Sequence, residues 1–257
     1  MSSKTIQKKI EKIAIFIIIL TLFKACSEVA SNDNIALNAS LNLEEGTISV
    51  FRGAEEKPIL VQNARSDFRP YLHPIAAPDG IGNVTQYSPD HHKHQTGLYW
   101  GFTRVNGDNI EQDSIHKWFY RSDKTEAQKK SVGRDYFHNP GAKYWKRVDF
   151  GLKDSIGDRV SWKTVYHMLD ENGKPILEET QHWSIREQEG KFLLELEWQG
   201  KALEAIRIGE YDYGGLFLRM PWQKGIKGEA VNFARQRNAR AEGQHALWVD
   251  VGMQVQG

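Results

Sequence analysis

The sequence predicts an all-β fold, an antiparallel β-sandwich, from about residue 43 to residue 257. One observation is that short runs of alternating apolar residues, rich in aromatic and β-branched side chains, recur along the chain. Another is that turn-forming sequences such as Asn106-Gly107 and Asn172-Gly173 separate these runs. The composition, 40% hydrophobic and 26% charged, is ordinary for a globular domain. We therefore expect one β domain without an internal linker.

Six segments are predicted as strands, in the order 47–52, 97–105, 160–169, 181–187, 191–199 and 215–221. The clearest is 191–199, in which apolar side chains at every second position alternate with Glu195 and Glu197. One face of this strand is therefore expected in the core and the other in solvent. A short helix is predicted at 125–130, and residues 246–257 contain the start of a further strand.

Residues 1–25 are arranged like a bacterial lipoprotein signal peptide, in which lysines precede an apolar run and Ala25 precedes Cys26. The run is shorter than a bilayer-spanning helix, so we expect cleavage, the alternative being a short anchor that is never cleaved. Cys26 is the only cysteine, which excludes an intrachain disulfide, and it resembles the lipidated cysteine of a lipobox. Residues 26–42, small and polar, are expected to form a flexible tether. The protein is therefore expected to be exported and lipid-anchored to a bacterial membrane, on its periplasmic or cell-surface side.

The charge balance argues against a nucleic-acid partner. The formal net charge is +1, and it becomes negative once residues 1–25, which hold more lysine than glutamate, are removed. The sequence also lacks G-x-S-x-G, Walker and dinucleotide-binding motifs, which disfavours serine hydrolases, NTPases and Rossmann enzymes.

The densest polar cluster is the string PDHHKHQTGLYWGF at 89–102, in which an H-x-H pair stands out. On an extended backbone His92 and His94 share a face, so both imidazoles can act on one ligand. The pair could hydrogen-bond a polyol, transfer protons near neutral pH, or bind zinc if another ligand arrived from elsewhere; a solvated loop is the alternative. No CxxC or HExxH motif accompanies it, so we expect neither a metal nor another cofactor.

Three other segments supply candidate site residues. The prolines of 68–74 exclude a helix and favour an extended segment, and the glycines of 210–219 precede a strand. Glu179 shares a strand face with Trp183, which predicts a buried acid with a raised pKa unless the strand begins in solvent. Arg69 could instead form a surface ion pair, and Arg219 could pair with a structural carboxylate. We expect His92, His94 and Glu179 to be catalytic, and the substrate to be bound by Arg69, Tyr71, His73, Trp100, Tyr213 and Arg219.

The strings RPYLHPIAAPDG, DHHKHQTGLYWGF, YDYGGLFLRMPW and ALWVDVG, in this order, resemble a bacterial family labelled "methane oxygenase PmoA-like" over Arg69 to Gly252. The resemblance implies a large β-sandwich of the galactose mutarotase supersandwich type and a role in carbohydrate catabolism. It maps His92 and His94 onto the family's histidine-rich string. Relatives continue past the Trp-Val-Asp strand, so a sandwich incomplete at its C-terminus is expected. Methane oxidation is not expected, because no apolar run after Cys26 approaches the length of a membrane span.

We therefore expect an exported lipoprotein that binds or processes a carbohydrate or sugar-derived compound on a concave sheet face. If it is an enzyme, proton transfer by an epimerase, lyase or hydrolase fits these residues. The alternatives are a non-catalytic carbohydrate-binding lipoprotein and a metal-dependent enzyme that uses the H-x-H pair. The membrane is expected to be a partner through the lipid anchor only. We expect His92, His94, Arg69 and Arg219 to converge on one pocket.

Overall fold

A computed structural model describes residues 36–254 of the chain. The predicted signal peptide, the predicted lipidation site at Cys26 and most of the predicted tether lie outside the described residues. Antiparallel sheets dominate the described part and form a β-sandwich, which confirms the all-β fold class. No helix in this range is long and apolar enough to cross a membrane.

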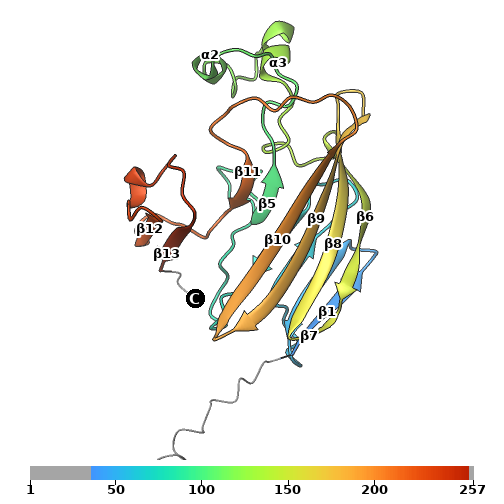
Figure 1. Ribbon diagram of the computed structural model, residues 1–257, viewed down its shortest axis with the longest axis vertical. Coiled ribbons are helices and arrows are strands. Elements are labelled where there is room, and N and C mark those ends of the chain that lie inside the picture. The colour runs from blue at the N-terminus through green and yellow to red at the C-terminus, as the bar shows by residue number, and fades with distance from the viewer. Residues whose placement is uncertain (1–35, 255–257) are drawn as a thin grey trace, which may run out of the picture. The chain divides into compact units, whose positions relative to one another are not determined.

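The larger sheet has seven strands, and each neighbouring pair is antiparallel (Figure 1). Across the sheet they are β11 (Gly215–Leu218), β5 (Leu98–Gly101), β4 (Tyr71–Ile75), β3 (Leu60–Asn63), β2 (Thr47–Arg52), β1 (Leu37–Asn42) and β7 (Ile156–Gly157). The free edge at β11 belongs to the segment that carries Arg219.

The second sheet has four long strands, β10 (Lys191–Ala202), β9 (Pro175–Gln188), β8 (Arg159–Leu169) and β6 (Trp145–Asp154), in this order. A separate hairpin pairs β12 (Gly228–Asn232) with β13 (Val249–Met253). The short helices are α2 (Gln112–His116), α3 (Glu126–Val132) and the 3₁₀ turn η1 (Asn238–Arg240). Both α-helices lie in the long excursion between β5 and β6.

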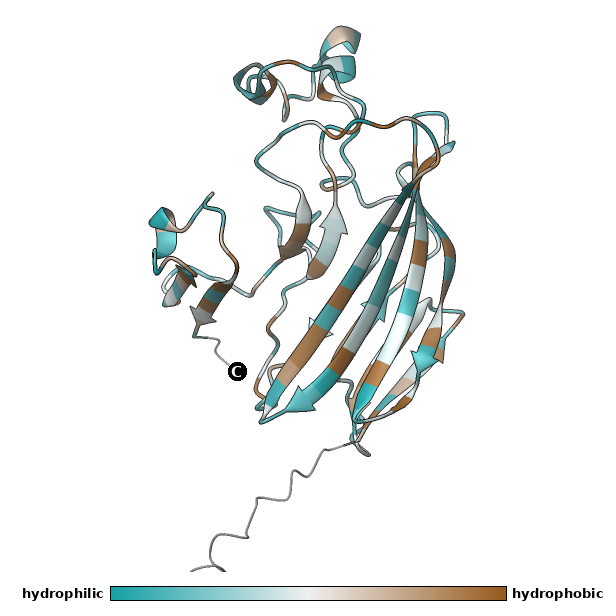
Figure 2. Cartoon of the chain, viewed as in Figure 1, coloured by the Kyte–Doolittle hydropathy of each residue, from teal (hydrophilic) through white to brown (hydrophobic). Residues whose placement is uncertain are grey.

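The main core lies between the two sheets and follows the period of two in the sequence. Ile48 and Leu72 from the large sheet pack with Trp162 and Trp183 from the small one, all nearly inaccessible to solvent. Hydrophobic and hydrophilic bands alternate along β8 and β10 (Figure 2). As predicted, the faces of β10 differ, because its alternate apolar side chains pack against this core while the glutamates are exposed.

The ordered β domain begins earlier than predicted, which corrects the expected boundary near residue 43. Residues 37–42, assigned to the tether, form β1 and pair with β2 along its whole length. Apolar and polar residues alternate at the start of this segment, LNASLN. Leu37 is fully buried in the core, and Ala39 packs against that core. Tertiary burial of these few side chains outweighs the polar local composition.

Several other predicted elements differ from the structure at their boundaries. The predicted strand 97–105 ends at Gly101, where a Cβ would collide with the backbone of Phe137, and the chain then turns away. The predicted helix at 125–130 is confirmed as α3, and Thr125 and Gln128 form a capping box at its start. Helix α2 was not predicted, because its five residues are too few to show a helical period.

Candidate functional site

The H-x-H pair lies in a turn, which corrects the expectation that it sits on a strand. A bridge between Tyr87 and Thr96 closes the segment, and inside it the His92 amide donates to the Pro89 carbonyl over 2.8 Å. The Gln95 amide in turn donates to the His92 carbonyl over 3.0 Å. The consecutive polar side chains of this segment supply no apolar face that a sheet could bury. The backbone therefore forms the local hydrogen bonds of a turn instead of the hydrogen bonds of a strand.

The turn folds the imidazoles together rather than sorting them onto alternate faces. The ring centroids of His91 and His92 are 4.6 Å apart, and those of His92 and His94 are 5.9 Å apart. A further histidine, His138 from the loop after α3, lies with its ring 4.6 Å from that of His94. We call these four residues the histidine cluster.

His138 is held in place by Asp135, one turn earlier in the same loop. Its Nδ1 lies 2.9 Å from Asp135 Oδ2, and its backbone amide donates to Oδ1 over 2.9 Å. Both side chains are only about one-seventh exposed, at 15% and 14%. An ionised carboxylate accepting from Nδ1–H fixes the tautomer and leaves Nε2 as the reactive nitrogen. The sequence analysis did not identify this pair, whose visible trace is the D-x-x-H spacing in DYFHNP.

The imidazoles of His94 and His92 are neutral at pH 7. Burial, and then the nearby His138 and Arg69, lower the pKa of His94 to about 4. The pKa of His92 is also lowered, by partial desolvation and then by His91 and Arg219. Neutral imidazoles can accept hydrogen bonds from hydroxyl groups.

Aromatic rings surround this cluster. The rings of Tyr120 and Tyr213 lie 5.6 and 6.1 Å from that of His138. Tyr213 is 48% exposed, so part of its ring is accessible to a ligand. The structure thus brings the predicted residue Tyr213 to the histidines, together with Tyr120, which was not predicted.

Arg69 lies beneath the cluster and is completely buried. Its Nη2 donates to the His94 carbonyl over 2.7 Å, and its Nη1 donates to the Phe137 carbonyl. The guanidinium also stacks on the Tyr99 ring, with Cζ 3.3 Å from the centroid. Burial lowers the pKa of Arg69 to about 10, so it stays charged at neutral pH. Arg69 therefore connects the two segments that carry the histidines, and its polar contacts are with protein atoms rather than with a substrate as expected.

Arg219, just after β11, lies on the other side of the histidine turn. Its Nε donates to Gln86 Oε1 over 3.0 Å, and its Nη1 donates to Gln95 Oε1 over 3.1 Å. Neither of these partners is a carboxylate, although a structural carboxylate was the predicted alternative partner of Arg219. His92, His94, Arg69 and Arg219 thus meet around segment 86–97, although Arg69 faces inward.

Tyr71 and His73 lie on β4, next to Tyr87 at the start of the turn. Each ring is 5.6 Å from the ring of Tyr87. His73 Nδ1 is 2.9 Å from Thr85 Oγ1, and burial lowers its pKa. Their ring contacts are with Tyr87 rather than with the histidine cluster.

Glu179 and Trp100 lie on the interior side of the sandwich, apart from the histidines. Glu179 is 1% exposed and accepts hydrogen bonds from Gln181 Nε2 and Trp198 Nε1 over 2.6 and 3.0 Å. Burial raises its pKa to about 7, as the sequence predicted. One face of Trp100 stacks on Trp198 at a centroid distance of 5.0 Å. These contacts place neither residue beside the H-x-H pair.

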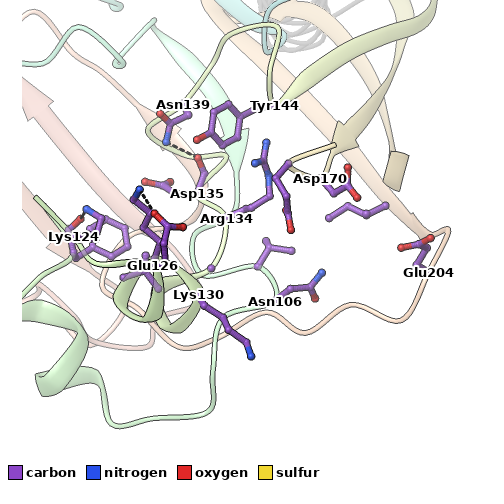
Figure 3. Close-up of a pocket in the computed structure, with 17 residues that line it drawn as sticks. Asn106, Lys124, Glu126, Lys130, Arg134, Asp135, Asn139, Tyr144, Asp170 and Glu204 are labelled. Atoms are coloured by element: carbon purple, nitrogen blue, oxygen red, sulfur yellow. Dashed lines mark hydrogen bonds and ion pairs between the residues drawn. The ribbon is translucent and has the colours of Figure 1, made fainter. Parts of the chain in front are cut away.

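A cleft of about 810 Å³ adjoins the Asp135–His138 pair, and the sequence analysis did not identify it. Asp135 and Asn139 line it, so the residue that orients His138 is also part of the cleft wall. Figure 3 shows Lys124, Glu126 and Asp135 on one side and Asp170 and Glu204 on the other. The lining comes from the loop after β5, the α3 region, the β8–β9 turn and the chain after β10, which are distant in sequence.

Within residues 36–254, no group of three or more His, Cys, Asp or Glu side chains is arranged to hold a metal ion. The structure therefore adds no ligand set to the metal-dependent alternative.

Comparison with known proteins identifies a family but no function. The model of a family described as "Family of unknown function (DUF6807)" matches residues 56–257, more than half of the chain. The chain belongs to this family. No curated protein and no solved structure matches it.

Proposed function

We propose that this member of the DUF6807 family binds a carbohydrate or sugar-derived compound at the histidine cluster and transfers a proton to or from it. The observation that carries the proposal is the Asp135–His138 pair, whose imidazole is in contact with His94 and whose carboxylate lines a cleft. An imidazole oriented by a carboxylate is a common arrangement for a general base or acid.

Each part of the site has a distinct role in this proposal. His138 is the base or acid, and Asp135 orients its ring through the contact at Nδ1. His94 and His92, neutral at pH 7, accept hydrogen bonds from substrate hydroxyl groups. The accessible ring of Tyr213 offers an apolar surface to the C–H face of a sugar. Glu179 is left out of the reaction, because it is buried and bonded to Gln181 and Trp198.

The finer fold and the location of the protein belong to the same proposal. A supersandwich of the galactose mutarotase type agrees with the two stacked antiparallel sheets, but this is an analogy of fold and fixes no reaction. Export and anchoring through Cys26 would place the site where bacteria meet external carbohydrates. Replacing Cys26 with serine should release the protein from the membrane fraction or leave it uncleaved, and unchanged fractionation and mature mass would contradict the anchor.

The catalytic role is tested with His138→Gln and Asp135→Asn. Sugars that bind the wild-type protein are found by calorimetry, and their conversion is followed by NMR in deuterated water. We expect both variants to bind the sugar but to lose about 10²–10⁴-fold in turnover.

The matched control is His167→Gln, because His167 also pairs with a carboxylate, Glu178, at 3.2 Å but on β8 and β9. This control should convert the sugar at the wild-type rate. A wild-type protein that binds the sugar without converting it would favour the non-catalytic alternative. Full turnover in His138→Gln would refute the role of His138.

A further inference from the structure

We infer that the ligand of the histidine cluster is anionic and that its acidic group binds beside Arg219. This inference rests on the proposed function and names the class of sugar, one that bears a carboxylate or another oxyanion.

Arg219 is a half-buried cation bonded to neutral groups only. Its Nε and Nη1 donate to the side-chain amides of Gln86 and Gln95, and none of the ion pairs among residues 36–254 includes it. An amide oxygen satisfies an N–H donor but does not neutralise a positive charge. The two amides fix the plane of the guanidinium, and its Nη2 makes no hydrogen bond to the described residues.

Arg69 adds a second cation near Arg219, and the carboxylates of Asp135 and Glu179 act on the charge of Arg69. Arg69, under the same turn, is also bonded only to neutral atoms, namely backbone carbonyls and the Thr96 hydroxyl. Two nearby carboxylates already have partners, since Asp135 binds His138 and Asp90 binds Lys93 at 2.7 Å. Arg219, a cation without a paired carboxylate among the described residues, can therefore attract and orient an anion.

His92 connects this cation to the reactive pair. It is exposed to solvent, and its ring lies 5.9 Å from that of His94, which lies 4.6 Å from that of His138. Arg219 reaches the same turn through its hydrogen bond to Gln95. A sugar whose acidic group contacts Arg219 would therefore lie across His92 with its ring near His138. Guanidinium binds planar carboxylates well because its N–H groups match the two oxygens.

The test compares three sugars with the same pyranose ring and different groups at C6, namely glucuronic acid, glucose 6-sulfate and glucose, with inorganic sulfate as a fourth probe. Binding to the wild-type protein, Arg219→Gln and Arg219→Lys is measured by calorimetry at low and high salt. We expect at least one acidic sugar to bind about tenfold more tightly than glucose, with the preference weakened by salt. Arg219→Gln should lose the preference, and Arg219→Lys should keep part of it.

The control is Arg159→Gln, because Arg159 is an exposed arginine that pairs with Glu195 between β8 and β10 of the second sheet. It should bind all probes as the wild type does, and melting temperatures establish that each variant is folded. Tighter binding of glucuronic acid than of glucose 6-sulfate identifies a carboxylate, and the reverse identifies a sulfate-like group. Binding of sulfate but of no sugar would indicate an adventitious ion only and would overturn the inference.

Equal binding of glucose and the acidic sugars would overturn the inference while leaving the proposed function intact. An acidic preference that persists in Arg219→Gln would overturn the placement beside Arg219. Absence of binding to every sugar would contradict both the inference and the proposed function.

Discussion

Charged and titratable groups occur beside aromatic rings in two regions of this protein, and the regions differ in their access to solvent. In the sandwich interior, Arg69 and Glu179 are 0% and 1% exposed, and their hydrogen bonds are to protein groups. In the histidine cluster, His92 is exposed and His138 is partly exposed. Residue type alone therefore does not identify a functional site. Buried groups that bond to the protein support the fold, although Arg69 Nε has no hydrogen-bond partner among the described residues. Groups with unused capacity that face solvent are available to a ligand.

The largest expected effect comes from removing the interior guanidinium. Arg69→Met should lower the free energy of unfolding by about 3–5 kcal/mol, because the buried carbonyls of His94 and Phe137 lose their donor. Chemical denaturation measures this change. The control is Arg65→Met, whose exposed side chain predicts a change within about 0.5 kcal/mol. A loss below about 1 kcal/mol in Arg69→Met would place Arg69 with the ligand-accessible groups instead.

The second prediction concerns Glu179 and pH. Its pKa is about 7 in the folded protein against an ordinary 4.5, so the folded state binds this proton more tightly than the unfolded state. The resulting stabilisation is fully present below pH 4.5 and is lost as the pH rises through 7, by an amount on the order of 3 kcal/mol. Glu179→Gln, which resembles the protonated acid, should remove this part of the pH dependence. Parallel stability–pH curves for the two proteins would contradict the interior assignment.

A third prediction concerns Trp198, whose indole contacts Glu179, and a variant that changes no charge. A Cβ at Gly200 would overlap the indole of Trp198, which donates to the Glu179 carboxylate. Gly200→Ala should therefore destabilise the fold by about 1–3 kcal/mol through overpacking. Gly151→Ala is the matched control, because Gly151 also lies in a strand and a Cβ there meets nothing within 4 Å. Equal melting temperatures for the two variants would show that the indole moves freely.

The smallest effect on stability is expected in the exposed region. His92→Ala should change the free energy of unfolding by no more than about 0.5 kcal/mol, because its side chain is solvated. Its sugar affinity should nevertheless fall by about 1–3 kcal/mol, as a binding group is lost. Calorimetry and denaturation of the same preparation separate the two quantities. Loss of stability without loss of affinity would reverse the comparison between the regions.

Local patterns predict the strands that carry their own periodicity. Strands β8, β9 and β10 show alternating apolar side chains, so their faces, and the burial of Glu179 with its raised pKa, can be inferred without a structure. Strand β1 was not predicted, because Asn and Ser separate its few apolar residues. The segment around His92 was considered as extended backbone, because an H-x-H spacing suits a strand as well as a turn.

The sequence by itself determined the fold class, the histidine-rich segment and the buried acid, since each depends on residues close together in the chain. Only the tertiary structure decided the partners of these groups. Arg69 binds carbonyls of residues 94 and 137, and Arg219 binds the amides of Gln86 and Gln95, contacts that span up to 133 positions. The same holds for His138 and Asp135, whose local spacing is unremarkable until the fold sets them beside His94. A side chain becomes structural or available to a ligand according to which partners and how much solvent reach it, and both depend on contacts that sequence periodicity does not encode.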